Sequence, residues 1–436
     1  MCMHSHRATR LVAIALLLVG SSLSAQHTDH DMAGLARDST PSSTFHMMAQ
    51  AIPLVTRAAP SAGGASYTEA TLTQALLMFR AGWWKGHARI DAALNGEGLT
   101  MKHGELNTGS FGEGFVDRRH PHTYIHEMML TGLGAAGPLK YSVSAGRGFA
   151  AFGTDDPMMR PIVKFPINHH LSQILERGAL VGAARLGVLT LEASTFGGAE
   201  PSSPSALPSV KRFGDSWSVR GTLVPLASAE LQASYARVAS PEEPSGFGLD
   251  QRKQSISARF ISDAGSRYAL AEWARTSEWD HSRSDGVFAY ESALVESAVR
   301  AGPFGITVRL EQTERPEEDR LLDPFRTPRP SSDLSINGIT QWRVATAQVA
   351  TGPVTTGILS GFPFVEIARL AATPRDLPSL FTPERLYGAS RFWMLTAGFR
   401  IRVGEAHARM GRYGAALPPG PQIGAMVGPE QHTHDH

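Results

Sequence analysis

The connections between the strand-like segments of this chain alternate in length. Short segments are joined in turn by a tight link and by a long stretch rich in Gly, Pro, Ser and charged residues. The tight links lie at Gly82 to Lys85, Leu133 to Pro138, Gly187, Pro225 to Ala227, Asp263 to Gly265, Ala301 to Pro303, and Thr351 to Gly352. The long connections lie near residues 57–68, 96–121, 148–177, 198–214, 239–251, 277–286, 314–337 and 372–388.

Eight long connections alternating with seven short ones join sixteen strands. An even number of antiparallel strands brings both ends of the chain to one side. In outer-membrane barrels the short turns face the periplasm and the long loops face outside. The alternation therefore predicts an all-β fold, a transmembrane antiparallel β-barrel of about 16 strands over residues 44–403.

Side chains within several segments alternate as barrel strands require. In the segment 393–403, Trp393, Leu395 and Phe399 lie on one face, whereas Arg400 and Arg402 lie on the other. Segments 217–223 and 304–311 repeat this pattern, with apolar residues expected toward lipid and polar ones toward the lumen. A secreted soluble β-sandwich alternates as well, but it has no reason for a strict alternation of loop lengths.

The N-terminal residues are typical of a secretory leader. Arg7 and Arg10 precede an apolar run, Leu11 to Gly20, and a small-residue stretch ends at Ala25. We expect a cleaved signal peptide over residues 1–25 and an N-terminal periplasmic tail over 26–43. The run is shorter than the roughly 20 apolar residues of a membrane-spanning helix. The leader and the strand pattern together predict a location in the bacterial outer membrane.

The composition narrows the partners. Lys and Arg number 41 and Asp and Glu number 40, a balance that argues against nucleic acid. The single cysteine lies in the leader, so the mature chain has no thiol chemistry. An exported barrel is instead expected to meet outer-membrane lipids, lipopolysaccharide, the outer-membrane assembly machinery and small solutes.

Two neighbouring outer loops contain the unusual polar residues. Candidates for a loop site or pore constriction are Asp117, Arg118, Arg119, Glu127, Asp155, Asp156 and Arg160. They could form ion pairs that fold the loops into the barrel mouth, or the arginines could bind lipopolysaccharide phosphates. The loop from Gly148 to Arg177 is the best candidate to fold inward and narrow a pore.

Histidines in the same loops suggest a metal site. Neutral imidazoles suit copper, nickel or zinc, with Asp117 or Glu127 as an added oxygen ligand; the candidate ligands are His120, His122, His169 and His170. Histidine-rich ends can also bind transition metals; here they contain His27, His30, His432, His434 and His436, the last three in a predicted periplasmic tail over 404–436. A copper or zinc ion is therefore a possible cofactor, although terminal tails are more often simply solvated.

Strand alternation also predicts which charged residues line the lumen. The candidates are Arg89, Asp91, Arg220, Arg309, Glu311, Arg343, Arg400 and Arg402. Arginines outnumber acidic residues among these candidates, and such an excess of positive charge in a lumen favours the passage of anions. The sequence contains no Gly-x-Ser-x-Gly motif and no supportive spacing of Ser, His and acid, so we expect no catalytic residues and no enzyme.

Several blocks resemble those of an uncharacterised family of bacterial outer-membrane β-barrel proteins. The blocks are Asp117 to Glu127, Met158-Met159-Arg160-Pro161, His169-His170, Phe196 to Pro201 with Asp215 to Ser218, and the closing Arg409 to Gly414. The resemblance covers most of the mature chain and implies a barrel, without a substrate. We expect a porin-like channel for small polar solutes or ions; the alternatives are a metal-handling barrel and a plugged, non-channel barrel that acts as an adhesin or structural protein.

Overall fold

The computed structural model describes residues 44–59, 66–101, 122–154, 156–167, 169–201, 203–262, 265–282, 284–318, 336–356, 358–376, 382–404 and 409–417 of the 436-residue chain. The strands are β1 (Thr44–Ala59), β2 (Tyr67–Trp83), β3 (Ala88–Asn95), β4 (Ile125–Ala136), β5 (Leu139–Gly148), β6 (Arg177–Leu186), β7 (Leu189–Gly197), β8 (Phe213–Leu226), β9 (Ala229–Val238), β10 (Asp250–Ile261), β11 (Arg267–Asp280), β12 (Asp285–Ala301), β13 (Phe304–Glu318), β14 (Ile336–Thr351), β15 (Val354–Thr356), β16 (Leu359–Asp376) and β17 (Arg391–Gly404). The short helices are α2 (Glu97–Thr100), η3 (Pro157–Met159), η4 (His169–Ser172), α3 (Pro383–Tyr387) and η6 (Gly414–Ala416).

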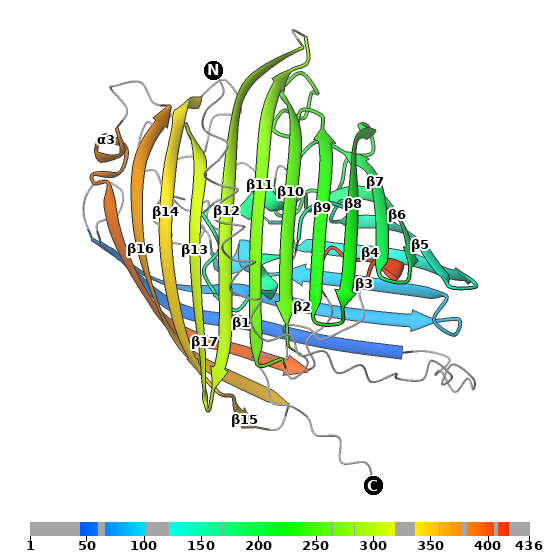
Figure 1. The fold of residues 1–436 in the computed structure, drawn as a ribbon, viewed down its shortest axis with the longest axis horizontal. Coiled ribbons are helices and arrows are strands. Elements are labelled where there is room, and N and C mark those ends of the chain that lie inside the picture. The colour runs from blue at the N-terminus through cyan, green and yellow to red at the C-terminus, as the bar shows by residue number, and fades with distance from the viewer. Residues whose placement is uncertain are drawn as a thin grey trace.

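The strands form one closed antiparallel sheet (Figure 1). Each strand pairs with the next along the chain, and β1 pairs with both β2 and β17, which closes the ring. The three-residue β15 continues the position of β14 beside the start of β16, since β14 also pairs directly with β16. The described residues therefore contain 17 strands at sixteen positions around the wall. The predicted barrel is confirmed.

The sequence of strand β1 shows no clear alternation of apolar and polar residues, but this strand closes the barrel by pairing with both β2 and β17. The register against β2 shifts between Gln50 and Ile52, a β-bulge. Pro53 has Leu72 of β2 as its register partner and none on β17. Proline cannot donate to a ladder, so a site where one neighbour is locally unpaired accommodates it.

The two faces of the wall differ as the sequence predicts. On β13, Ile306, Val308 and Leu310 are 40–51% exposed on the outside, whereas Arg309 and Glu311 are buried inside. The outer face is therefore apolar and suited to lipid. None of the helices in the described residues is long and apolar enough to cross a membrane.

All seven predicted tight links are short connections at one end of the barrel, and seven of the eight predicted long stretches are long loops at the other. The stretch near 277–286 differs. Here β11 runs to Asp280 and β12 starts at Asp285, so a four-residue turn closes a hairpin that rises above its neighbours in Figure 1. Its polar residues continue the ladder, with Glu278 opposite Phe288.

Candidate functional site

The connection from β5 to β6, residues 149–176, folds into the barrel. Its apolar side chains are buried even though no strand of the wall contains them: Phe149, Ala150, Ala151, Phe152, Met158, Ile162, Val163, Phe165, Ile167, Leu171, Ile174 and Leu175. We call residues 149–176 the inner loop. The prediction that the loop from Gly148 to Arg177 enters the barrel is confirmed.

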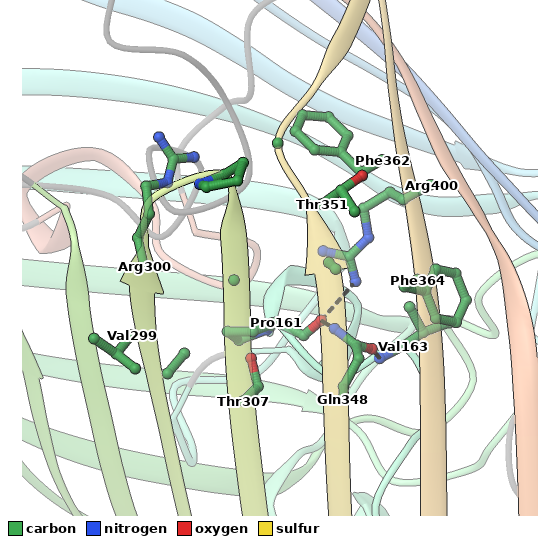
Figure 2. A pocket seen from close by; sticks show the side chains of 15 residues that line it. Pro161, Val163, Val299, Arg300, Thr307, Gln348, Thr351, Phe362, Phe364 and Arg400 are labelled. Atoms are coloured by element: carbon green, nitrogen blue, oxygen red, sulfur yellow. Dashed lines mark hydrogen bonds between the residues drawn. The ribbon is translucent and has the colours of Figure 1, made fainter.

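Hydrogen bonds from the wall hold the middle of the inner loop (Figure 2). Arg400 on β17 donates from Nη2 to the carbonyl oxygens of Arg160 and Pro161, each at 3.2 Å. Gln348 on β14 donates to the Pro161 carbonyl at 3.0 Å and accepts from the Val163 amide at 3.1 Å. The wall thus satisfies backbone groups that lie away from any helix or strand, as buried polar groups require.

Further contacts tie the loop to other strands. Arg160 donates to Glu272 of β11 at 3.1 Å. Arg309 of β13 donates to the Lys164 carbonyl at 2.9 Å, and Glu311 accepts from the Ile167 amide at 3.3 Å. The predicted residues Arg160, Arg309, Glu311 and Arg400 therefore meet around one segment.

A cleft lies beside this segment. Figure 2 shows Thr307, Gln348 and Arg400 around it, together with Arg300 and Phe362. Residues of two tight turns, Pro303 and Gly352, also line the cleft, which places it at the tight-turn end of the barrel.

The segment 409–417 also lies inside the barrel, and we call it the C-terminal insert. Arg412 donates to Glu192 at 3.1 Å, to Thr222 at 2.9 Å and to Glu230 at 3.3 Å. Arg409 adds a second ion pair with Glu230, at 2.8 Å between Nη2 and Oε1. The predicted lumen residue Arg220 reaches the same group: it pairs with Glu192 at 2.6 Å and donates to the Gly411 carbonyl at 2.8 Å.

The two inserted segments touch each other, because the Phe149 amide donates to the Tyr413 hydroxyl at 2.9 Å. Residues 404–436 were predicted to form a periplasmic tail, but residues 409–417 contact the wall and the inner loop inside the barrel. The sequence Arg409-Met410-Gly411-Arg412 contains two closely spaced arginines, and this spacing could have indicated that the segment pairs with acidic residues of the wall.

One predicted lumen residue is wrongly placed. Arg343 is exposed on the outer face of β14, whereas its neighbour Trp342 is fully buried inside. Trp342 packs on Phe392 with ring centroids 5.5 Å apart, in a cluster that includes Ile167 of the inner loop. The inner loop makes this part of the interior apolar, so the tryptophan faces inward and the arginine faces outward.

The other predicted lumen residues face inward. Asp91 is buried and accepts from Arg89 at 2.8 Å. Arg402 donates to Gln50 at 2.8 Å. Arg220 and Arg309 are paired with carboxylates, whereas Arg400 donates to two backbone carbonyl groups and Arg402 donates to the amide oxygen of Gln50.

The predicted histidine metal site stays a prediction, but the structure describes the surroundings of one of its members, His122. His122 lies beside His126 and Glu176, all three buried, at the long-loop end of β4 and β6. His126 and Glu176 were not predicted as ligands. A plain strand would direct His126 away from Glu127, but the register of β4 shifts between the partners Ala93 and Leu94, so both side chains are buried.

Asp156 and Glu127 also belong to this end of the interior. Asp156 caps η3 by accepting from the Met158 amide at 2.7 Å and lies 3.9 Å from His126 Nε2. Asp117, Arg118, Arg119, His120, Asp155 and the histidines of both tails lie outside the described residues. His169 and His170 begin η4, and the structure describes only their backbone.

Three polar groups lie close to one carboxylate oxygen of Glu176. The Thr123 amide donates to its Oε1 at 3.0 Å, and the two Nδ1 atoms of His126 and His122 lie 2.6 and 3.2 Å from the same oxygen. Burial acts to raise the pKa of Glu176, but the two imidazoles outweigh it and hold this pKa well below its usual range. The carboxyl group is therefore ionised.

No protein-family model matches the sequence, and no curated protein matches it. Among solved structures, the chain is similar to an anion-selective porin from Comamonas acidovorans, with 10% identity, a TM-score of 0.48 and coverage of 83% of this chain and 99% of that one. It is also similar to the outer membrane channel DcaP of Acinetobacter baumannii, with 10% identity, a TM-score of 0.44 and coverage of 82% and 96%. The strand pairing described above establishes the barrel independently.

Proposed function

We propose that the protein is a porin-like channel of the bacterial outer membrane that passes small polar solutes, with a preference for anions, and that it is not an enzyme. The observation that carries the proposal is a closed barrel with an apolar outside and a charged inside, crossed by a loop that the wall holds through hydrogen bonds. A barrel of this size can enclose an aqueous channel.

The inner loop and the C-terminal insert make the channel narrow. Both occupy the interior, so solutes would pass along the remaining polar surfaces such as the cleft beside Arg400. Carboxylates neutralise Arg220 and Arg309, whereas Arg400 and Arg402 donate to neutral groups. Positive charge in a narrow polar passage favours anions.

The proposal places the tight turns in the periplasm and the long loops outside, in contact with lipopolysaccharide. The leader over residues 1–25 would direct export, and the outer-membrane assembly machinery would insert the barrel. Membership of the uncharacterised outer-membrane barrel family noted above is part of the same proposal.

Planar-bilayer conductance of the refolded mature chain tests the function. The variant replaces Asp155 to His170 with a short Gly-Ser linker, and a matched control exchanges the β11–β12 turn, residues 281–284, for Gly-Ser. We expect a small steady conductance with an anion-selective reversal potential, a several-fold increase in the loop variant, and no change in the control.

A folded, heat-modifiable barrel that stays electrically silent in both forms would instead identify a plugged barrel with a structural or adhesive role. If the protein conducts and the loop replacement leaves its conductance unchanged, the inner loop does not constrict the channel.

A further inference from the structure

The cluster of His122, His126 and Glu176 has the shape of a metal site. Their three nearest ligand atoms form a triangle: the two Nδ1 atoms lie 3.3 Å apart, and Glu176 Oε1 lies 3.2 Å from one and 2.6 Å from the other. The residues come from the segment before β4, from β4 itself and from the end of the inner loop.

The triangle matches the size of a late first-row metal ion. Bonds of about 2.0–2.1 Å in a tetrahedron place neighbouring ligand atoms roughly 3.3 Å apart. Two sides of the triangle already have this length, and the third, between His126 and Glu176, needs to widen by only about 0.7 Å. An ion would lie just outside the plane of the three atoms, with its fourth position open.

The hydrogen bonds of the cluster need only one proton between the two facing nitrogens. The Nδ1 atoms of His122 and His126 lie 3.3 Å apart, so one donates and the other accepts, and both lie within 3.2 Å of Glu176 Oε1. A cation can take the place of this shared proton, because two neutral imidazole nitrogens and a carboxylate oxygen suit a late first-row metal ion.

The backbone is unusual at two of the three residues. The β-bulge directs His126 inward beside Glu127. Glu176 has a φ of 60°, in the left-handed region that side-chain-bearing residues seldom adopt. Residues held in such conformations are strained and are found often at functional sites.

A partner is present behind the triangle. When His126 binds a metal through Nδ1, its Nε2 carries the proton, and Asp156 Oδ2 lies 3.9 Å from this atom. Asp156 is fixed by the Met158 amide at 2.7 Å and by Gln173 at 3.2 Å. A carboxylate behind a ligating histidine orients the ring and raises its basicity.

The site can be reached from the long-loop end. Glu176 lines a cleft whose other walls come mainly from the β7–β8 loop. The arginines on this cleft include Arg177, paired with Glu200 at 2.8 Å, and Arg212, paired with Asp215 at 2.8 Å. The charges of Arg177 and Arg212 are thereby offset, whereas Arg147, which also lines this cleft, donates to the Ala206 carbonyl and is attracted by Glu176 itself.

We propose that His122, His126 and Glu176 bind one divalent ion of the zinc and copper class, with Asp156 as the partner of His126. The ion fastens the end of the inner loop to the start of β4. This site goes beyond the channel function and differs from the four-histidine site predicted from sequence, of which it keeps only His122.

Zinc titration by calorimetry tests the site on the full mature chain refolded in detergent. The five tail histidines, at 27, 30, 432, 434 and 436, are first changed to Gln so that the ends cannot bind. We expect one zinc ion per chain. Glu176→Gln and His122→Gln should each weaken binding at least about 100-fold, and Asp156→Asn about 10- to 100-fold.

His281→Gln is the matched control, because His281 is a histidine whose side chain is 76% exposed on the barrel. It should leave binding unchanged. Cobalt substituted for zinc should give the intense visible absorption of a four-coordinate ion in the background chain and lose it in Glu176→Gln. Heat modifiability on gels and circular dichroism show whether each variant folds. If either Glu176→Gln or His122→Gln fails to fold, zinc binding by the other variant tests the site.

Stoichiometric zinc binding that survives both Glu176→Gln and His122→Gln would overturn the proposal, as would a folded background chain that binds no zinc. Conductance is measured on the same samples. Because a channel needs no metal in this site, loss of zinc binding with normal conductance would refute the metal site alone.

Discussion

We expect Arg412 to contribute more than any other residue to holding the C-terminal insert in place. Its guanidinium is 1% exposed and donates to Glu192, Thr222 and Glu230. Arg412→Met keeps much of the volume and removes all three bonds, while Glu192 keeps Arg220 and Glu230 keeps Arg409. Hydrogen bonds to charged groups contribute about 1.5–3 kcal/mol each to stability. Because both carboxylates stay paired in the variant, we expect its free energy of unfolding to fall by about 3 kcal/mol in total.

The complementary change is Glu192→Gln. It removes the carboxylate that lies 2.6 Å from Arg220 and leaves Arg412 with Glu230 alone, at 3.3 Å; removing one partner of a buried ion pair costs about 3–5 kcal/mol. We therefore expect Glu192→Gln to lower the free energy of unfolding at least as much as Arg412→Met does.

Equilibrium unfolding by urea in lipid vesicles, followed by tryptophan fluorescence, measures both variants. Arg343→Met is the control, because Arg343 lies on the outer face and should change the free energy of unfolding by less than about 1 kcal/mol. Bilayer conductance should rise in Arg412→Met as the insert loosens. Unchanged stability together with unchanged conductance would refute the view that this arginine holds the insert in place.

Three further predictions concern residues of the loops and of the barrel interior. Burial raises the pKa of Glu97 to about 8, so its protonated form stabilises the fold; this contribution is complete below its ordinary pKa of 4.5 and is lost as the pH rises to 8. The free energy of unfolding should therefore fall by up to about 4 kcal/mol between pH 5 and pH 9 in the parent and much less in Glu97→Gln; equal falls would contradict this. Gly153→Ala should destabilise by several kcal/mol, because φ is 71° and the new Cβ would lie 1.6 Å from the Ser172 carbonyl oxygen; a urea midpoint equal to that of the parent would contradict the close approach. Arg400→Gln should raise conductance and shift the reversal potential toward cations, and an unshifted potential would exclude Arg400 from the passage.

Much of the wall could be predicted from the sequence, because strand number follows from the alternation of connections and face follows from a period of two residues. The interior could not be predicted in the same way. The inward position of Trp342 depends on Ile167, far away in the chain, which makes that patch of the lumen apolar. Alternation alone therefore assigned Arg343 to the wrong face.

The candidate metal ligands show the same limit in a more local form. His122 was recognisable because it belongs to a histidine-rich loop. His126 was hidden by a one-residue bulge that redirects a strand position inward, and Glu176 was hidden because its loop meets β4 only in the folded barrel. Bulges and loop docking depend on tertiary contacts that leave no periodic trace in sequence.

The hydrogen bond between the Phe149 amide and the Tyr413 hydroxyl joins positions 264 residues apart. Tyr413 follows β17, the strand that pairs with β1 to complete the ring. Contacts of such long range form late, since chain closure costs entropy before it is rewarded. The interior should therefore reach its final packing only as the last strand joins the first, and an intermediate with an unclosed wall would still have a water-filled, protease-sensitive centre.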